Sequence, residues 1–113
     1  MSQKSDITKM TNLILTGNNL TNSSISSLLD HPFSSLEELQ LNKNRLLVGE
    51  ALKGMANKTY TNLTILDLSE TSIGDQGIEY LSQARFPKLV TLMLKDVDMT
   101  EKGIEYLSTV DFP

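Results

Sequence analysis

Leucines recur along the chain in a fixed short motif, called the strand phrase below, in which apolar and polar positions alternate. The centre of the phrase is a leucine, one intervening residue and a second leucine. It occurs four times, at steps of 26, 27 and 26 residues, beginning at Leu13, Leu39, Leu66 and Leu92. Apolar residues at every second position lie on one face of a β-strand. The phrase therefore predicts four equivalent short strands whose leucines face the core.

A second phrase follows each strand phrase, and it predicts a short helix. Two apolar residues three positions apart, which mark the inner face of a helix, are followed by an aromatic residue. Thr100 is a natural N-cap, and Asp75 and Glu101 suit the positive end of a helix. The four copies are Ile25, Leu28 and Phe33; Leu52, Met55 and Tyr60; Ile78, Leu81 and Phe86; and Ile104, Leu107 and Phe112.

The two phrases together predict a repeating unit of strand, turn, helix and loop. Because no unit can bury its apolar face alone, the units are expected to stack, with Leu39 between Leu13 and Leu66. The strands then pair in parallel about 4.8 Å apart. We expect right-handed crossovers, and a stack that bends so that the strands line its concave side and the helices its convex side.

The expected fold is one α/β domain, a right-handed solenoid of four strand–helix units over residues 1–113. The extra residue of the second unit falls at 47–49, in the turn that leads into its helix. Residues 1–9 are expected to be the tail of a preceding unit, so the chain is expected to be part of a longer solenoid. The units are expected at residues 10–35, 36–62, 63–88 and 89–113.

The strand phrase resembles the Leu-x-x-Leu-x-Leu-x-x-Asn-x-Leu signature of leucine-rich repeats. In that family the asparagine amide donates hydrogen bonds to backbone carbonyls of the turn. The corresponding positions here are Asn18, Asn44, Thr71 and Val97. Thr71 can supply one donor and Val97 can supply none, so the chain changes from an asparagine subtype toward one that accepts other residues.

The third unit is similar to the cysteine-containing and ribonuclease-inhibitor-like subclasses of the family. The resemblance rests on Ile-Gly-Asp-Gln-Gly-Ile-x-x-Leu, which begins at Ile73, and on the Phe-Pro-Lys-Leu segment that ends at Leu89. Phe86 and Phe112 stand where those subclasses often carry cysteine. Such repeats occur in F-box substrate receptors of ubiquitin ligases, in sensing arms of innate immune receptors and in effectors of intracellular bacteria. The resemblance implies a scaffold that is not an enzyme and that binds another protein.

Composition and charge exclude several other classes. The net charge of −4, without runs of like charge, disfavours nucleic acid as a partner. The absence of cysteine excludes disulfides and thiolate zinc sites, and a single histidine leaves little for a metal centre. No apolar stretch reaches the roughly 18 residues of a membrane span, and no signal peptide is recognised. We therefore expect a cytoplasmic protein that binds neither a cofactor nor a membrane.

The outward side chains of the predicted strands and the turns after them form the candidate binding surface. It is dipolar, with Lys43 and Arg45 in the second unit and acidic residues in the third and fourth, which could orient a protein partner. Carboxylate pairs such as Asp67 and Glu70 lie on a shallow face without a histidine, so no catalytic or metal residue is assigned. The predicted partner-binding residues are Gln40, Asn42, Lys43, Arg45, Asp67, Ser69, Glu70, Met93, Lys95 and Asp96.

A structural role is the alternative to partner binding. The last unit is expected to leave an apolar layer uncovered, formed by Leu92, Leu94, Ile104, Leu107 and Phe112. Exposed apolar layers recruit partners or associate with one another. The chain could accordingly be an architectural or oligomerisation segment of a larger protein, and it could self-associate through its uncapped ends.

Overall fold

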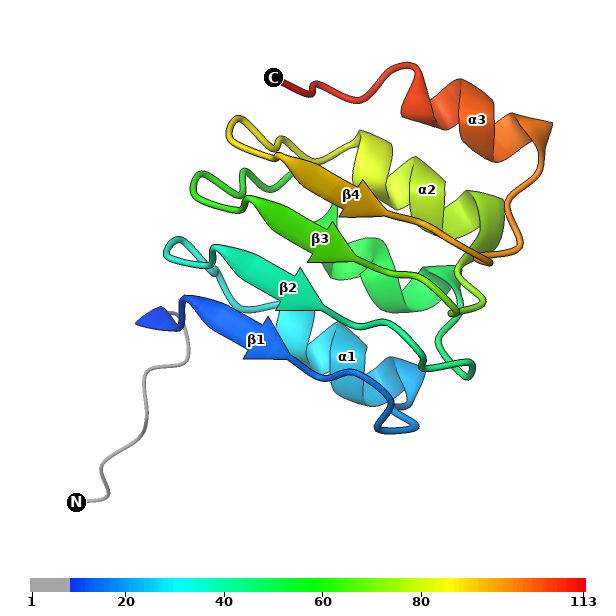
Figure 1. Ribbon diagram of the computed structural model, residues 1–113, viewed down its shortest axis with the longest axis horizontal. Coiled ribbons are helices and arrows are strands. Elements are labelled where there is room, and N and C mark those ends of the chain that lie inside the picture. The colour runs from blue at the N-terminus through cyan, green and yellow to red at the C-terminus, as the bar shows by residue number, and fades with distance from the viewer. Residues whose placement is uncertain (1–8) are drawn as a thin grey trace.

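Four short strands form one parallel sheet in the computed structural model, which describes residues 9–113 (Figure 1). Each strand pairs with the strand of the next unit, in the order β1-β2-β3-β4. Leu13, Leu39, Leu66 and Leu92 are direct register partners, so the predicted stacking of the leucines is confirmed. The strands are β1 (Asn12–Ile14), β2 (Glu38–Gln40), β3 (Ile65–Asp67) and β4 (Thr91–Met93).

One helical segment follows each strand, as the second phrase predicts. Within residues 9–113 these segments are α1 (Asn22–Leu29), η2 (Gly49–Met55), α2 (Gly74–Ser82) and α3 (Glu101–Leu107). They stack on one side of the sheet and leave its other side uncovered (Figure 1). The tail of a preceding unit that the sequence predicts at residues 1–9 lies, except for Lys9, outside the described residues.

The core lies between the sheet and the helices, and each unit adds one layer to it. The leucines of β2 and β3 that face the helices are fully buried. Behind them runs a column of aromatic rings, in which Tyr60 and Phe86 stack nearly parallel with centroids 5.7 Å apart. Phe86 and Phe112 follow at 6.4 Å. The aromatic residues of the second, third and fourth units therefore pack on one another.

Two helices differ in detail from the predicted pattern. In α1 the buried pair is Ile25 and Leu29, one turn apart, while Leu28 is only half-buried. The segment η2 is a 3₁₀ helix and contains two glycines, which lower the propensity for an α-helix. A Cβ atom at Gly49 would lie 2.7 Å from Cβ of Gln76, so close packing against α2 requires a glycine there.

The fourth unit is the least buried part of the described chain. Gly103 is the only buried residue of α3, and Ile104 is 59% exposed. Phe112 is 39% exposed, whereas Phe86, at the same position one unit earlier, is 1% exposed. The fourth unit covers the third. Of the apolar layer predicted to be uncovered, Ile104 and Phe112 are exposed, whereas Leu92, Leu94 and Leu107 are half-buried.

Candidate interaction surface

The side of the sheet opposite the helices (Figure 1) carries a row of outward strand residues, which alternate with the leucines that face the core. The outward residue of each strand occupies the same register position in all four units. Ile14 at one end of this row is 54% exposed and Met93 at the other end is 46% exposed. Gln40 is half-buried between them, and its side-chain amide donates to the carboxylate of Glu38. An accessible apolar residue therefore lies at each end of the row.

Asp67 and Ser69 are exceptions, because their side chains hold the backbone together. Asp67 is 7% exposed, and its Oδ1 accepts a hydrogen bond from the backbone N–H of Ser69 at 2.9 Å. Ser69 is 6% exposed, and its Oγ accepts from the backbone N–H of Lys95 at 3.0 Å. Both predicted binding residues are therefore buried and make hydrogen bonds within the fold.

The other predicted residues remain accessible at least in part. Asn42 is half-buried and accepts a hydrogen bond from the hydroxyl of Thr16 at 2.8 Å, which joins the first two units. Lys43, Lys95 and Asp96 are exposed. Charged and polar groups from three units thus lie along the open side of the sheet and the turns that follow it.

Asn44 fixes the turn that carries Lys43 and Arg45. It is fully buried, and its Nδ2 donates to the carbonyls of Leu15 at 3.0 Å and Leu41 at 2.9 Å. Its Oδ1 accepts from the backbone N–H groups of two residues in the first unit, both at 3.1 Å. These bonds confirm the predicted role of the asparagine. Because these hydrogen bonds fix the backbone on both sides of the turn, the exposed charged side chains extend from a rigid backbone.

The residue that begins each turn has a left-handed backbone in all four units. The φ angles are 68° at Gly17, 62° at Lys43, 57° at Glu70 and 55° at Asp96. Glycine adopts such angles without strain, whereas other residues adopt them at a cost. Three of the four units nevertheless carry a charged residue there. The turns therefore present their charges from a conformation that the rest of the fold enforces.

Arg45 brings three of the predicted residues together across three units. Its Nη2 lies 3.9 Å from Oε1 of Glu70, and its Nη1 donates to the backbone carbonyl of Asp96 at 3.2 Å. The side chains of Arg45 and Glu70 are 56% and 38% exposed, so this ion pair adds little stability. Its consequence is geometric, because it holds a guanidinium group over the turns of the third and fourth units.

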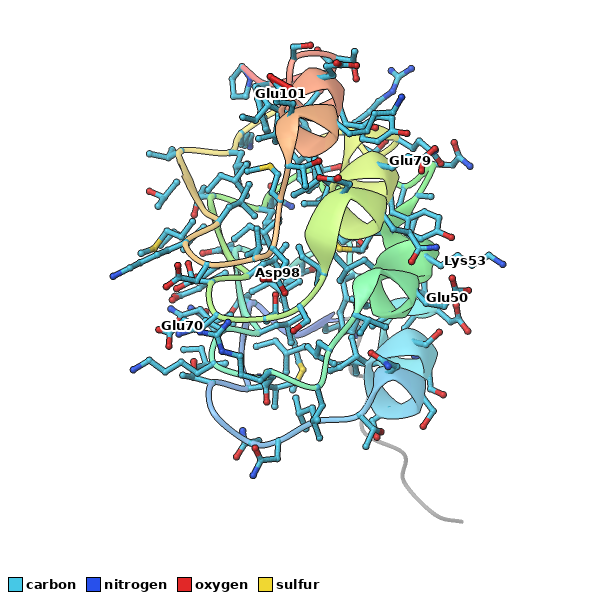
Figure 2. The ribbon with its side chains drawn as sticks, turned by 90° about the vertical axis from the view of Figure 1, so that its right-hand side faces the viewer. Glu50, Lys53, Glu70, Glu79, Asp98 and Glu101 are labelled. Carbon is cyan, nitrogen blue, oxygen red and sulfur yellow. The ribbon has the colours of Figure 1, made fainter. Side chains whose placement is uncertain are left out.

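A groove of about 500 Å³ lies beside the turn of the fourth unit. Polar and apolar side chains both contribute to its wall. The sequence pattern assigns Leu94 to the uncovered apolar layer of the last unit, and it does not identify Val97 and Met99 as part of a surface. Figure 2 shows Asp98 and Glu70 on the edge of the molecule formed by the loops after the strands. The residues lining the groove are Arg45, Leu94, Asp96, Val97, Asp98 and Met99.

The described part of the chain meets the requirements of neither a metal centre nor a membrane-spanning helix. Residues 9–113 contain no group of three potential metal ligands close enough to hold an ion. None of the helices in that range has the length and apolar character needed to cross a bilayer. His31 is exposed in the loop after α1, where its Nδ1 lies 3.2 Å from the carbonyl of Leu28.

One comparison with known proteins matches part of the chain. Residues 61–82, which contain β3 and all of α2, match the family model described as Leucine Rich repeat. This match supports a leucine-rich repeat family. No curated protein and no solved structure matches the chain. Leucine-rich repeats generally mediate protein–protein interaction and are typically not enzymes, so the open side of the sheet is the surface to consider first.

Proposed function

We propose that this leucine-rich repeat protein is a scaffold, not an enzyme, and that it binds a partner protein on the uncovered side of its sheet. The observation that carries the proposal is the row of outward residues on the side of the sheet opposite the helices, where Ile14 and Met93 are exposed and Gln40 is half-buried. The strands are paired, and the turn after β2 is fixed by Asn44. Rigid strands present these side chains in a fixed grid. Little ordering entropy is then lost when a partner binds.

We further propose that the four units form a right-handed solenoid with this row on its concave side, divided at residues 10–35, 36–62, 63–88 and 89–113. The charges support an oriented complex, since Lys43 and Lys95 are exposed beside Glu70 and Asp96. Such a distribution steers association more than it tightens binding. Aromatic side chains, which usually dominate hot spots, do not occur among the predicted binding residues, so we expect moderate affinity.

Site-specific photo-crosslinking tests the proposal. A photoreactive residue replaces Gln40 or Met93 on the open side of the sheet, and Glu79 on α2 as the control (Figure 2). We expect one protein from the source cells to be captured at both strand positions and not at Glu79. That protein is then identified, purified and titrated against the chain. Equal capture at all three positions, or no binding of the purified protein, would contradict the proposal.

A second candidate function is assembly through the apolar end of the stack. Val90 is 82% exposed and Ile104 59% exposed in the fourth unit. Sedimentation velocity of the chain and of Ile104→Ser tests this candidate, with Ile14→Ser as the control on the open side of the sheet. Assembly that Ile104→Ser abolishes and Ile14→Ser preserves would support the structural role. A monomer at all concentrations would argue against it.

A further inference from the structure

The groove beside the turn of the fourth unit has a mostly polar lining, with acidic groups and a smaller apolar wall. Leu94 and Met99 are half-buried and line it, together with the buried Val97. Asp96 and Asp98 are exposed in the same turn, with φ angles of 55° and 61°. A volume of about 500 Å³ is typical of pockets that enclose a small ligand or a few side chains.

The charges at the groove favour a cationic occupant. Arg45 is the one basic residue in its lining, and it already lies against Glu70 and the carbonyl of Asp96. The carboxylates of Asp96 and Asp98 therefore exceed the positive charge that the chain itself supplies there. Arg45 also shows that a guanidinium group fits beside this turn and can donate a hydrogen bond to a backbone carbonyl there.

We propose that this groove binds an extended segment of the partner protein that carries lysine or arginine on either side of an aliphatic residue. The aliphatic side chain contacts Leu94 and Met99, and the flanking cations lie beside Asp96 and Asp98. Opposite charges at the rim select the segment, and the apolar wall supplies contact area. This inference rests on the proposed function, since it assigns the chemistry of the partner and the place where it binds.

Fluorescence anisotropy with labelled synthetic peptides tests the groove directly. The probe has leucine at its centre, lysine on either side and glycine at its ends. Two comparison peptides replace the lysines by glutamate or the leucine by serine. We expect the lysine–leucine peptide to bind at low ionic strength, the glutamate peptide not to bind, and the serine peptide to bind more weakly.

Variants of the chain separate the groove from general charge effects. Asp96→Asn with Asp98→Asn should weaken binding of the lysine–leucine peptide about tenfold, because both carboxylates lose their charge. Asparagine tolerates a left-handed backbone well, so this variant should fold. The matched control, Asp30→Asn with Asp111→Asn, removes the same charge from exposed positions elsewhere and should change affinity less than about twofold.

Arg45→Gln gives the opposite expectation, because it removes the cation that competes for the groove. It should strengthen binding of the lysine–leucine peptide severalfold, whereas Lys53→Gln on η2 should not (Figure 2). The inference is overturned if the peptide does not bind, if the serine peptide binds equally, or if the two double variants weaken binding alike. A partner captured at Gln40 that binds the Asp96→Asn, Asp98→Asn variant unchanged would also overturn it and leave the proposed function intact.

Discussion

The carboxylate of Asp75 in α2 caps the start of α3 by accepting hydrogen bonds from Thr100. The backbone N–H of Thr100 donates to Oδ1 at 2.8 Å, and the Thr100 hydroxyl donates to Oδ2. The backbone N–H of Gly103 also donates to Oδ1 at 2.9 Å. The same device joins the first two units, where Oδ1 of Asn22 accepts from the N–H of Val48 at 2.8 Å. Helix starts are therefore stabilised by side chains of the preceding unit.

These hydrogen bonds make the attachment of α3 dependent on pH. The bond from the Thr100 hydroxyl, followed by that from the Thr100 backbone, lowers the pKa of Asp75 below its usual value. A lowered pKa in the folded state means that the stabilisation is complete above about pH 4 and is lost as the pH falls through the folded pKa. We expect the amide of Gly103 to exchange hydrogen faster, relative to the amides of α2, as the solution is acidified into that range.

Asp75→Asn provides the test of that assignment. The variant should accelerate exchange at Gly103 near neutral pH and should reduce the additional loss of protection on acidification, because the titrating group is gone. Asp30→Asn, at the exposed end of α1, is the control and should leave exchange in α3 unchanged. Equal exchange at Gly103 in both variants would show that Asp75 does not hold α3.

The buried polar column between the units predicts a graded loss of stability. Asn44→Val should destabilise the fold by about 3 kcal/mol, because it leaves several buried backbone groups unpaired. Thr71→Val should cost only about 1 kcal/mol, because Thr71 donates a single bond, to the carbonyl of Leu68 at 2.7 Å. Val97 already occupies this position in the fourth unit, where it is buried. Urea unfolding of the two variants measures the difference, and equal costs would contradict this account.

The repeat period made most of the fold predictable. A spacing of 26 or 27 residues places each leucine of one strand against the same leucine of the next, and the structure has that register. The roles of Asn44 and Thr71 also follow from their place in the phrase. Positions that recur in each unit are constrained by both neighbours, so periodicity alone assigns their environment.

The candidate surface was less predictable because it depends on contacts that the period does not contain. Alternation along a strand placed Asp67 and Ser69 outward, but their side chains satisfy backbone N–H groups in the turn and become buried. The reach of Arg45 from the second unit to Asp96 in the fourth depends on a side-chain conformation. The groove also includes Val97 and Met99, which the pattern does not assign to a surface. Each of these features depends on the three-dimensional arrangement of side chains, which the repeat period does not determine.

The left-handed residue of the turn is a glycine in the first unit and a charged residue in the other three units. The backbone strain at this position can therefore be compared between a glycine and a non-glycine residue of the same protein. Gly17→Ala should destabilise the fold by about 1 kcal/mol, since an alanine there is strained, although an added Cβ would meet no atom within 4 Å. Lys43→Gly should stabilise it by roughly 0.5 kcal/mol, the relief of strain being partly offset by the entropy of glycine. Thermal unfolding measures both changes, and opposite signs at the two positions are the decisive outcome.

Tyr60 carries a polar group that the fold does not use. Its ring is buried between the second and third units, and its Oη has no hydrogen-bond partner among residues 9–113. Burial also raises the pKa of the phenol, so the hydroxyl stays protonated. Phe33 and Phe86 occupy the equivalent positions of the neighbouring units without a hydroxyl. The phenol oxygen of Tyr60 is therefore desolvated without compensation.

Tyr60→Phe should accordingly stabilise the protein by about 1 kcal/mol, because it removes a desolvated hydroxyl and keeps the ring that stacks on Phe86. The reciprocal change, Phe86→Tyr, should destabilise it by about 1–2 kcal/mol, since it buries a new hydroxyl at an equivalent position. Urea unfolding of both variants separates the hydroxyl from the ring. A loss of stability in Tyr60→Phe would mean that the hydroxyl is hydrogen-bonded after all, and the ring stack would then be only part of what holds the second and third units together.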